Sequence, residues 1–361
     1  MHGEASFSTG RITDTQRAIL GFGLGLLVMF TATRVFLVNS YDFENMSRGV
    51  RLLLSGVNPW AAATQVPDFY NPPHSVLFLW PMLFLSPQVF LSLGAACLFA
   101  FVFYRRAWVA LAWFATNTAL WLIAAGGIDM LIVGAGLLFL LAGDSMFSTK
   151  RGLALRVIAY GLLMVKPQGG VFIVLLFLIT RLDWKGALLS LAVYTLLFSP
   201  LYPSWINVLI SDPPLAQTEA THTLWARYGF LVALLIALGT IVARKWRYWE
   251  LGGALAGILA PYGMPGLPSF LTLTAVSSLK AIPIVVIWSA LLSIATWVTP
   301  PAGIDYYDYL QPFMAIFHLS MFALSLALAC MSPDAQDDKT IAINSWLRQM
   351  LSHLNPRFGS G

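Results

Sequence analysis

Long apolar segments recur along almost the whole chain and are separated by short clusters of Lys and Arg. Hydrophobic residues make up 58% of the 361 residues, charged residues only 10%, and the mean hydropathy is +0.75. Such a composition cannot supply the polar surface of a water-soluble protein. Because a transmembrane helix needs about 20 largely apolar residues, the sequence predicts an all-α, polytopic transmembrane bundle of about 10–12 spans.

The basic clusters predict the orientation of the chain, because cytoplasmic loops are enriched in Lys and Arg. We expect residues 1–331 to form one membrane domain, with a retained first span at residues 18–38, and residues 332–361 to form a cytoplasmic tail. Both termini are then cytoplasmic, and a plasma membrane is the expected location. The clusters that we assign to the inner face are Arg11 with Arg17, Arg105 with Arg106, Lys150 with Arg151, Arg181 with Lys185, Arg244 with Lys245 and Arg247, and Lys280. These clusters explain the net charge of +5, so no nucleic acid partner is expected.

This orientation gathers the polar segments on the outer face, at residues 39–88, 126–129, 166–168, 200–227, 261–268 and 299–309. The first of them is the most informative. Met46, Val50 and Leu53 recur there at helical spacing, whereas Arg48 and Arg51 fall on the other side, which predicts an interfacial amphipathic helix. The apolar stretch at residues 76–85 is too short for a span and is flanked by prolines, so we expect a re-entrant or interfacial helix.

The two cysteines, Cys97 and Cys330, both lie in apolar segments. Buried thiols are therefore expected rather than a disulfide, and the sequence offers no cluster of metal ligands. We expect no metal and no cofactor.

Several short motifs occur in a recognisable order along the first half of the chain. They are Tyr41-Asp42-Phe43, Gly56-Val57-Asn58-Pro59-Trp60, Asp68-Phe69-Tyr70-Asn71-Pro72-Pro73, Gly126-Gly127-Ile128-Asp129 and Val165-Lys166-Pro167-Gln168. In this order the chain resembles the GT-C class of membrane glycosyltransferases, and most of all the prokaryotic polyprenyl-phosphate-mannose-dependent mannosyltransferases (glycosyltransferase family 87). The resemblance covers roughly residues 20–200.

The resemblance implies a GT-C-like fold and a catalytic carboxylate at the outer end of the first span, which is Asp42 here. It also implies a Gly-x-Asn-Pro-Tyr-like stretch, a Tyr-Pro-Pro-like stretch, a Gly-Gln-x-Asn/Asp-like turn and a Lys-Pro turn. Trp60, Asn71 and Gly127 depart from those patterns. The departures are compatible with a different substrate or with a lost activity.

The expected chemistry is an inverting transfer from a sugar linked through phosphate to a lipid. One carboxylate must take the proton of the acceptor hydroxyl, and cationic groups must offset charge on the departing phosphate. We assign Asp42 as the base and Arg48 and Arg51 as nearby cations. The residues alone leave open that Asp42 only marks the membrane boundary or caps a helix from about Phe43.

Further candidate substrate-binding residues lie on the same predicted face. Asp68 is a second carboxylate of the first loop, or else a solvated turn residue. Asp129 and Lys166 flank spans, where ionisable groups usually face a cavity or a partner, and they either pair with each other or bind substrate separately. The remaining candidates are Gln168 in the Lys-Pro turn and His222 and Arg227 in the segment 200–227.

Three functions follow from this pattern. The first is a glycosyltransferase that moves a sugar, such as mannose, from a polyprenyl-phosphate donor to a lipid or glycan acceptor on the outer face. The second is a non-catalytic or degenerate GT-C-like subunit held against a partner in a larger membrane complex. The third is a transporter, although two related halves with broken helices are not evident in the sequence.

Overall fold

The computed structural model describes residues 12–36, 41–61, 66, 69–124, 126–211, 223–260, 266–294 and 306–333. Within these residues every regular element is a helix and no strand occurs, so the prediction of an all-α fold is confirmed. The α-helices are α1 (Asp14–Phe36), α2 (Tyr41–Leu54), α3 (Val76–Leu79), α4 (Pro87–Arg105), α5 (Asn117–Ala124), α6 (Asp129–Ser145), α7 (Lys150–Leu163), α8 (Pro167–Arg181), α9 (Trp184–Leu197), α10 (Tyr202–Ser211), α11 (Leu224–Tyr228), α12 (Phe230–Ala243), α13 (Tyr248–Leu259), α14 (Gly266–Leu273), α15 (Ala281–Ile294) and α16 (Tyr306–Met331). Three 3₁₀ helices accompany them, namely η1 (Pro73–Ser75), η2 (Trp80–Leu83) and η3 (Trp108–Ala115).

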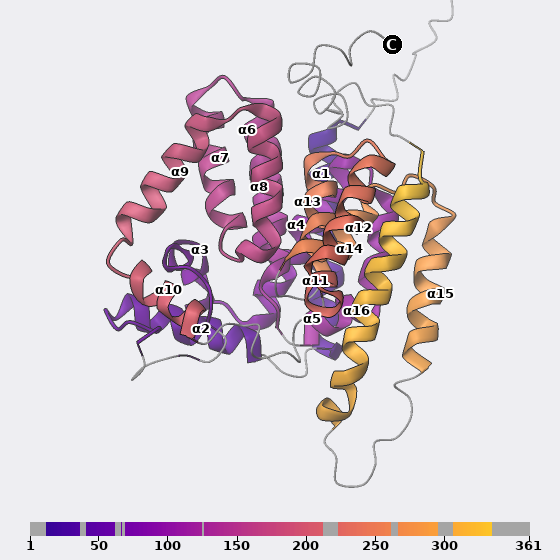
Figure 1. Ribbon diagram of the computed structural model, residues 1–361, viewed down its shortest axis with the longest axis horizontal. Coiled ribbons are helices and arrows are strands. Elements are labelled where there is room, and N and C mark those ends of the chain that lie inside the picture. The colour runs from indigo at the N-terminus through magenta and orange to yellow at the C-terminus, as the bar shows by residue number, and fades with distance from the viewer. Residues whose placement is uncertain are drawn as a thin grey trace, which may run out of the picture.

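The helices form two groups that meet at α4 (Figure 1). One group contains α6 to α10, with α2 and α3 beneath them, and the other contains α11 to α16 with α1 and α5. Helix α4 packs along α1 and against α6, α6 pairs with α7, and α13 joins the groups by packing against both α8 and α14. The main apolar core runs through both groups, and a second core lies beneath α2 and α3.

Glycines let α4 and α6 approach each other closely. A Cβ atom placed on Gly94 of α4 would lie 2.7 Å from the backbone nitrogen of Leu131. A Cβ atom on Gly134 of α6 would lie 2.8 Å from Cβ of Cys97. Small residues at such contacts are the usual means by which membrane helices pack tightly, since lipid supplies no hydrophobic force to press them together.

Two of the described helices are long and apolar enough to cross a membrane, at Asp14–Arg34 and Pro87–Arg105. A third crossing is available if α9 and α10, which meet at an angle of 92°, are counted as one broken span. Other apolar helices are shorter, including Pro167–Arg181, Phe230–Ala243, Ala281–Ser293 and Ala315–Met331. The chain thus contains helices capable of spanning a membrane, whereas 10–12 spans stay a prediction.

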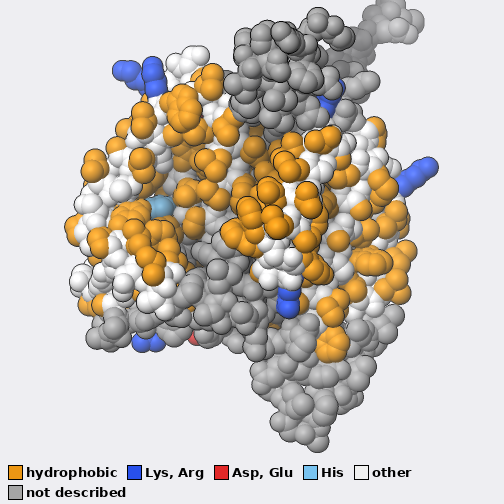
Figure 2. All heavy atoms as spheres, viewed as in Figure 1, with side chains coloured by type: hydrophobic (Ala, Val, Ile, Leu, Met, Phe, Trp, Pro, Cys, Tyr) orange, Lys and Arg blue, Asp and Glu red, His pale blue; other side chains and the backbone are white. Residues whose placement is uncertain are grey.

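The surface supports the same conclusion. Figure 2 shows apolar side chains spread across the visible face, with few Lys and Arg side chains. Large apolar residues are exposed along whole helices, as at Leu188, Leu191 and Leu196 of α9 and at Leu231 and Leu235 of α12. Continuous exposed apolar surface is rare on soluble monomers and is suited to lipid or to another membrane chain.

The outer segment 39–88 follows the sequence prediction in part. Helix α2 buries Phe43, Met46 and Val50 and exposes Arg48 and Arg51, as expected for an amphipathic helix. Residues 76–85 form no span but the two short pieces α3 and η2, which agrees with the predicted broken element. The helix begins at Tyr41, so Asp42 lies within its first turn and does not cap a helix that starts at Phe43.

Two segments expected to be loops contain helices. The segment 200–227 includes α10 and most of α11, and α16 begins inside the segment 299–309, at Tyr306. Aromatic and charged residues in both segments suggested interfacial loops, but apolar residues of α10 such as Val208 pack into the second core.

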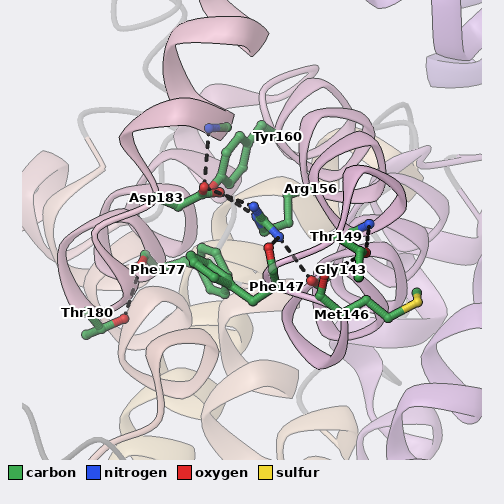
Figure 3. Close-up of polar contacts among 11 residues, drawn as sticks. Gly143, Met146, Phe147, Thr149, Arg156, Tyr160, Phe177, Thr180 and Asp183 are labelled. Carbon is green, nitrogen blue, oxygen red and sulfur yellow. Dashed lines mark hydrogen bonds and ion pairs between the residues drawn. The ribbon is translucent and has the colours of Figure 1, made fainter.

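A buried ion pair joins the end of α6, the middle of α7 and the turn from α8 to α9 (Figure 3). Arg156 of α7 donates through Nε to Oδ2 of Asp183 at 2.7 Å and through Nη2 to Oδ1 at 3.2 Å. Nη1 donates to the carbonyl oxygens of Gly143 and Phe147, both at 3.1 Å. Tyr160 donates its hydroxyl to Asp183 Oδ2 at 2.8 Å. The side chains of Arg156 and Asp183 are only 3% and 2% exposed, so each charge depends on the other.

Asp183→Asn tests how far the fold depends on this pair. The substitution keeps the shape of the side chain but leaves the buried guanidinium without its counter-charge, so we expect the free energy of unfolding to fall by about 3–5 kcal/mol. The thermal unfolding midpoint of the purified protein in detergent measures the effect. Arg151→Gln, which removes an exposed charge from the same helix, should change stability by about 0.5 kcal/mol or less. Equal midpoints for Asp183→Asn and the unmodified protein would show that the pair does not hold the helices.

Candidate functional site

Asp42 lies where the amphipathic helix α2 begins. Phe43, Met46 and Val50 anchor this helix in the second core, and Asp42 is half-buried beside them. The first turn of a helix favours negative charge because its backbone N–H groups point toward the N-terminus. The local sequence thus holds a carboxylate at the edge of a buried surface.

The carboxylate of Asp42 faces the turn that precedes α6. A Cβ atom on Gly127 would lie 3.9 Å from Oδ2 of Asp42 and 3.2 Å from Cδ2 of Leu122. The bare backbone of this turn therefore forms one wall beside the carboxylate. Gly127, which departs from the resembling families, occupies a place where a Cβ atom would lie close to Leu122 and in ordinary contact with Asp42.

Two residues beyond Gly127, α6 starts with an ion pair. Lys166 Nζ lies 2.8 Å from Oδ1 of Asp129, and the two side chains are 21% and 27% exposed. Lys166 precedes α8, whose first residue is Pro167, a residue well suited to the first helical position. The sequence left open whether Asp129 and Lys166 pair with each other or bind substrate separately, and in the structure they are paired.

Hydrogen bonds tie the motifs of the outer segment to the same place. Asn71 donates through Nδ2 to the carbonyl oxygen of Val165 at 3.0 Å, directly before Lys166. Trp60 stacks on Phe69 with ring centroids 5.6 Å apart and donates through Nε1 to the carbonyl oxygen of Phe69 at 3.0 Å. Asn71 and Trp60, both departures from the resembling families, therefore have structural contacts that hold the segment in place.

Helix α10 braces the outer segment from the other side. Trp205 donates through Nε1 to the carbonyl oxygen of Tyr70 at 2.9 Å. The hydroxyl of Tyr202 lies 3.0 Å from Nδ1 of His74, whose ring also packs on Tyr194. His74 is 5% exposed, which fits a structural hydrogen-bonding residue.

Other predicted site residues are not brought to Asp42. Arg51 follows Asp42 by nine residues, about 180° around α2 at 100° per residue, and both Arg48 and Arg51 lie on its exposed face. Arg227 is exposed on α11, which packs against α12 and α13. Gln168 lies in the first turn of α8 and is half-buried, two residues after Lys166. Asp68 and His222 lie outside the described residues.

Among the described residues, no group of three or more His, Cys, Asp or Glu side chains could hold a metal ion. Cys97 and Cys330 are both free thiols. Within the described part of the chain, the groups that the contacts around Asp42 link are the carboxylates of Asp42 and Asp129, the ammonium group of Lys166 and the backbone of the turn at Gly127.

Two cavities occur elsewhere in the described structure. An apolar groove of about 440 Å³ lies between α12 and α16, and a cavity of about 60 Å³ lies among the ends of α4, α6 and α8 and the start of α13. Asp42, Asp129 and Lys166 line neither of them. Residues 37–40, 62–65 and 67–68, which belong to the chain on either side of α2, lie outside the described part, as do residue 125 before the turn at Gly127 and residues 212–222 after α10. A substrate cavity at Asp42 stays a prediction.

Comparison with protein family models, curated proteins and solved structures found no match to this chain. Any assignment of function therefore rests on the motifs and on the geometry around Asp42.

His74 gives the outer segment a testable pH dependence. It lies outside the helices that could span a membrane, and burial lowers its pKa from 6.5 to about 4, with a smaller opposing effect from the Gly161 backbone. The folded protein therefore keeps His74 neutral, while the unfolded chain takes up a proton below about pH 6.5. The buried neutral His74 therefore makes its full contribution to the free energy of unfolding above pH 6.5. This contribution is lost as the pH falls toward 4, by roughly 3 kcal/mol in all.

The measurement is the unfolding midpoint between pH 7.5 and pH 4.5 for the unmodified protein and for His74→Gln. Glutamine retains a hydrogen-bonding group near Tyr202 but does not titrate. We expect a smaller loss of stability in acid for His74→Gln. Parallel curves for the two proteins would contradict a buried neutral His74.

Proposed function

We propose that the chain is a GT-C-type membrane glycosyltransferase that transfers a sugar, such as mannose, from a polyprenyl-phosphate donor to a lipid or glycan acceptor. The observation that carries the proposal is the meeting of three separate motifs. Asp42 faces the turn at Gly127, that turn leads into Asp129, and Asp129 pairs with Lys166. The Asp42 motif is thus linked to the Lys166 motif through the turn at Gly127 and the ion pair of Asp129.

In the proposed reaction Asp42 acts as the general base. It takes the proton of the acceptor hydroxyl while the acceptor oxygen bonds to the anomeric carbon, and the bond from that carbon to the lipid phosphate breaks. The polyprenyl phosphate leaves with the bonding electron pair, and attack from the opposite face inverts the anomeric centre. No cofactor takes part in this scheme.

Lys166 is the proposed partner of the leaving phosphate. A cation fixed near the departing oxygen stabilises charge that develops in the transition state. Asp129, 2.8 Å away, holds the ammonium group in place before the donor arrives. The structure does not bring Arg48 and Arg51 of α2, Gln168 of α8 or Arg227 of α11 to Asp42, and Asp68 and His222 lie outside the described residues. These six residues are proposed to bind parts of the donor or acceptor that are remote from the reacting atoms.

The proposed orientation places this site on the outer face of a plasma membrane, with both termini in the cytoplasm. It is supported by the direction of α6 and α8, which begin at Asp129 and after Lys166 and end near basic residues such as Lys150 and Arg181. Under the rule that Lys and Arg concentrate in cytoplasmic loops, the site and the basic ends lie on opposite sides.

A non-catalytic subunit of a membrane complex is the second candidate. The observation in its favour is that Asp129 and Lys166 neutralise each other, as a purely structural pair would. The exposed apolar residues of α9 and α12 offer the surface that a membrane partner would cover.

Asp42→Asn separates these candidates. Because asparagine keeps the shape but removes the base, we expect transfer of radiolabelled sugar in proteoliposomes to fall by about 10²- to 10⁴-fold. The donors are a panel of polyprenyl-phosphate sugars. Glu44→Gln is the matched control, since Glu44 is an exposed carboxylate in the first turn of the same helix. Its activity should stay within about twofold of the unmodified protein, because it is outside the proposed site.

Absence of transfer by the unmodified protein with every donor would favour the non-catalytic subunit. Full activity of Asp42→Asn would retain the enzyme but remove Asp42 from the role of base.

Lys166→Gln tests the proposed phosphate contact. If Lys166 binds the donor phosphate, we expect KM for the donor to rise and kcat to fall by about tenfold or more, because an interaction strengthened in the transition state is lost. Asp129→Asn should cause a smaller kinetic loss, since it only positions Lys166. Equal losses of stability in both variants without a change in donor KM would identify a structural pair.

A further inference from the structure

A small polar cavity lies at the ends of α6 and α8 that are remote from Asp42. It occupies about 60 Å³ and is lined by Arg105, Asp144, Arg181, Arg247, Tyr248 and Trp249. Arg105 and Arg181 come from the last turns of α4 and α8, and Tyr248 and Trp249 open α13. Since α8 has 15 residues, its two ends are about 22 Å apart. The cavity is therefore separate from the Asp42 region.

Three buried atoms around this cavity have no hydrogen-bond partner among the described residues. They are Nε of Arg181, the hydroxyl oxygen of Tyr248 and Nε1 of Trp249. Tyr248 is 8% exposed and Trp249 is 4% exposed. An unsatisfied buried polar group costs about 1–3 kcal/mol, so such groups are normally satisfied by something. All three groups can donate a hydrogen bond, which indicates a ligand rich in hydrogen-bond acceptors.

The charges of the cavity favour an anion. Arg105, Arg181 and Arg247 bring three positive charges, against Asp144 and the adjacent Glu250. Asp144 pairs with Arg181 at 2.6 Å, and Glu250 lies 3.5 Å from Arg247. With all five groups ionised, the net charge of these described residues is +1.

The geometry also limits how the arginines can turn. The guanidinium of Arg105 lies 4.8 Å from the ring centre of Trp249, and that of Arg247 lies 5.5 Å from it. Cation–π contacts of this kind hold guanidinium groups in place against the ring. Two arginines on one indole thus fix positive charge beside the cavity.

We propose that this cavity binds a phosphate group, which is either free phosphate or the headgroup of a membrane lipid. Planar guanidinium groups match phosphate oxygens with paired hydrogen bonds, and the hydroxyl and indole N–H groups supply further donors. One water needs about 10–15 Å³ of such a volume, so about 60 Å³ accepts a group of a few heavy atoms but not a sugar nucleotide. The site does not depend on the glycosyl transfer proposed for the opposite end of the helices.

The test uses the purified full-length protein in phosphate-free detergent buffer. Binding of radiolabelled inorganic phosphate is measured by equilibrium dialysis. In parallel, native mass spectrometry compares phosphatidic acid with a diacylglycerol that has the same acyl chains and lacks only the phosphate. We expect saturable binding of one inorganic phosphate, of one phosphatidic acid, or of both in competition, and no comparable binding of diacylglycerol.

Three variants assign the binding to this cavity. Arg181→Gln should weaken binding by at least about tenfold, because it removes a charged donor. Tyr248→Phe should weaken it by roughly threefold or more, and this variant keeps the buried ring, so it tests the site even if Arg181→Gln folds poorly. Lys185→Gln is the control, since Lys185 is an exposed residue of the same basic cluster, and its binding should equal that of the unmodified protein.

Phosphate that binds and competes with the lipid identifies a site for free phosphate, and binding of phosphatidic acid alone identifies a lipid headgroup site. The proposal is overturned if neither ligand binds, if Arg181→Gln and Tyr248→Phe bind as well as the unmodified protein, or if Lys185→Gln loses as much affinity as Arg181→Gln.

Discussion

The arrangement of α6, α7, α8 and α9 depends on the buried contact between Arg156 and Asp183. Two charges taken from water must be paired and fully hydrogen-bonded, and here Tyr160 and two backbone carbonyls complete the set. This requirement fixes how the end of α6, the middle of α7 and the turn from α8 to α9 meet. Because a helix is stiff over 15 to 17 residues, the positions of the opposite ends follow. Those ends carry Asp129 and Lys166.

The same two helices thus link two chemically different places. At their starts, carboxylates dominate and one ammonium group is held by Asp129. At their ends, Asp144 and Arg181 join a cavity where arginines predominate. In a lipid environment charged groups gather at helix ends because the middle of a span cannot hydrate them. The two places are separated by about 22–26 Å, the lengths of α8 and α6 at 1.5 Å per residue, which is somewhat less than the thickness of a bilayer core of about 30 Å.

Structural features that depend on the local sequence pattern could be predicted from the sequence. Apolar periodicity predicted α2 with its buried Met46 and Val50, and short apolar length with prolines predicted the broken element at residues 76–85. The starts of α6 and α8 at the Gly-Ile-Asp and Lys-Pro turns were also recognisable, since such residues commonly begin helices. The pairing of Asp129 with Lys166 was one of two arrangements that the sequence allowed.

Contacts between residues that are far apart in the sequence could not be predicted. Arg156 follows the basic pair at residues 150–151, and Asp183 lies between Arg181 and Lys185. Nothing in this local pattern distinguishes either residue from a charged residue exposed to solvent. Only the folded packing of α7 against α9 reveals that they are buried together. Likewise, nothing local shows that the side chain of Asn71 reaches the backbone of Val165, 94 residues away. Helix α10 was missed because its apolar residues face a core made by a distant segment.

The right-angled junction of α9 and α10 has a mechanical consequence. The two helices meet at 92°, and α10 grips the outer segment through Trp205 and Tyr202. Together they form a right-angled support in which α10 holds the segment that contains Tyr70 and His74 (Figure 1). Membrane helices tilt when bilayer thickness changes. Because hydrogen bonds join α10 to this segment, a tilt of α9 that α10 followed would move the segment with it.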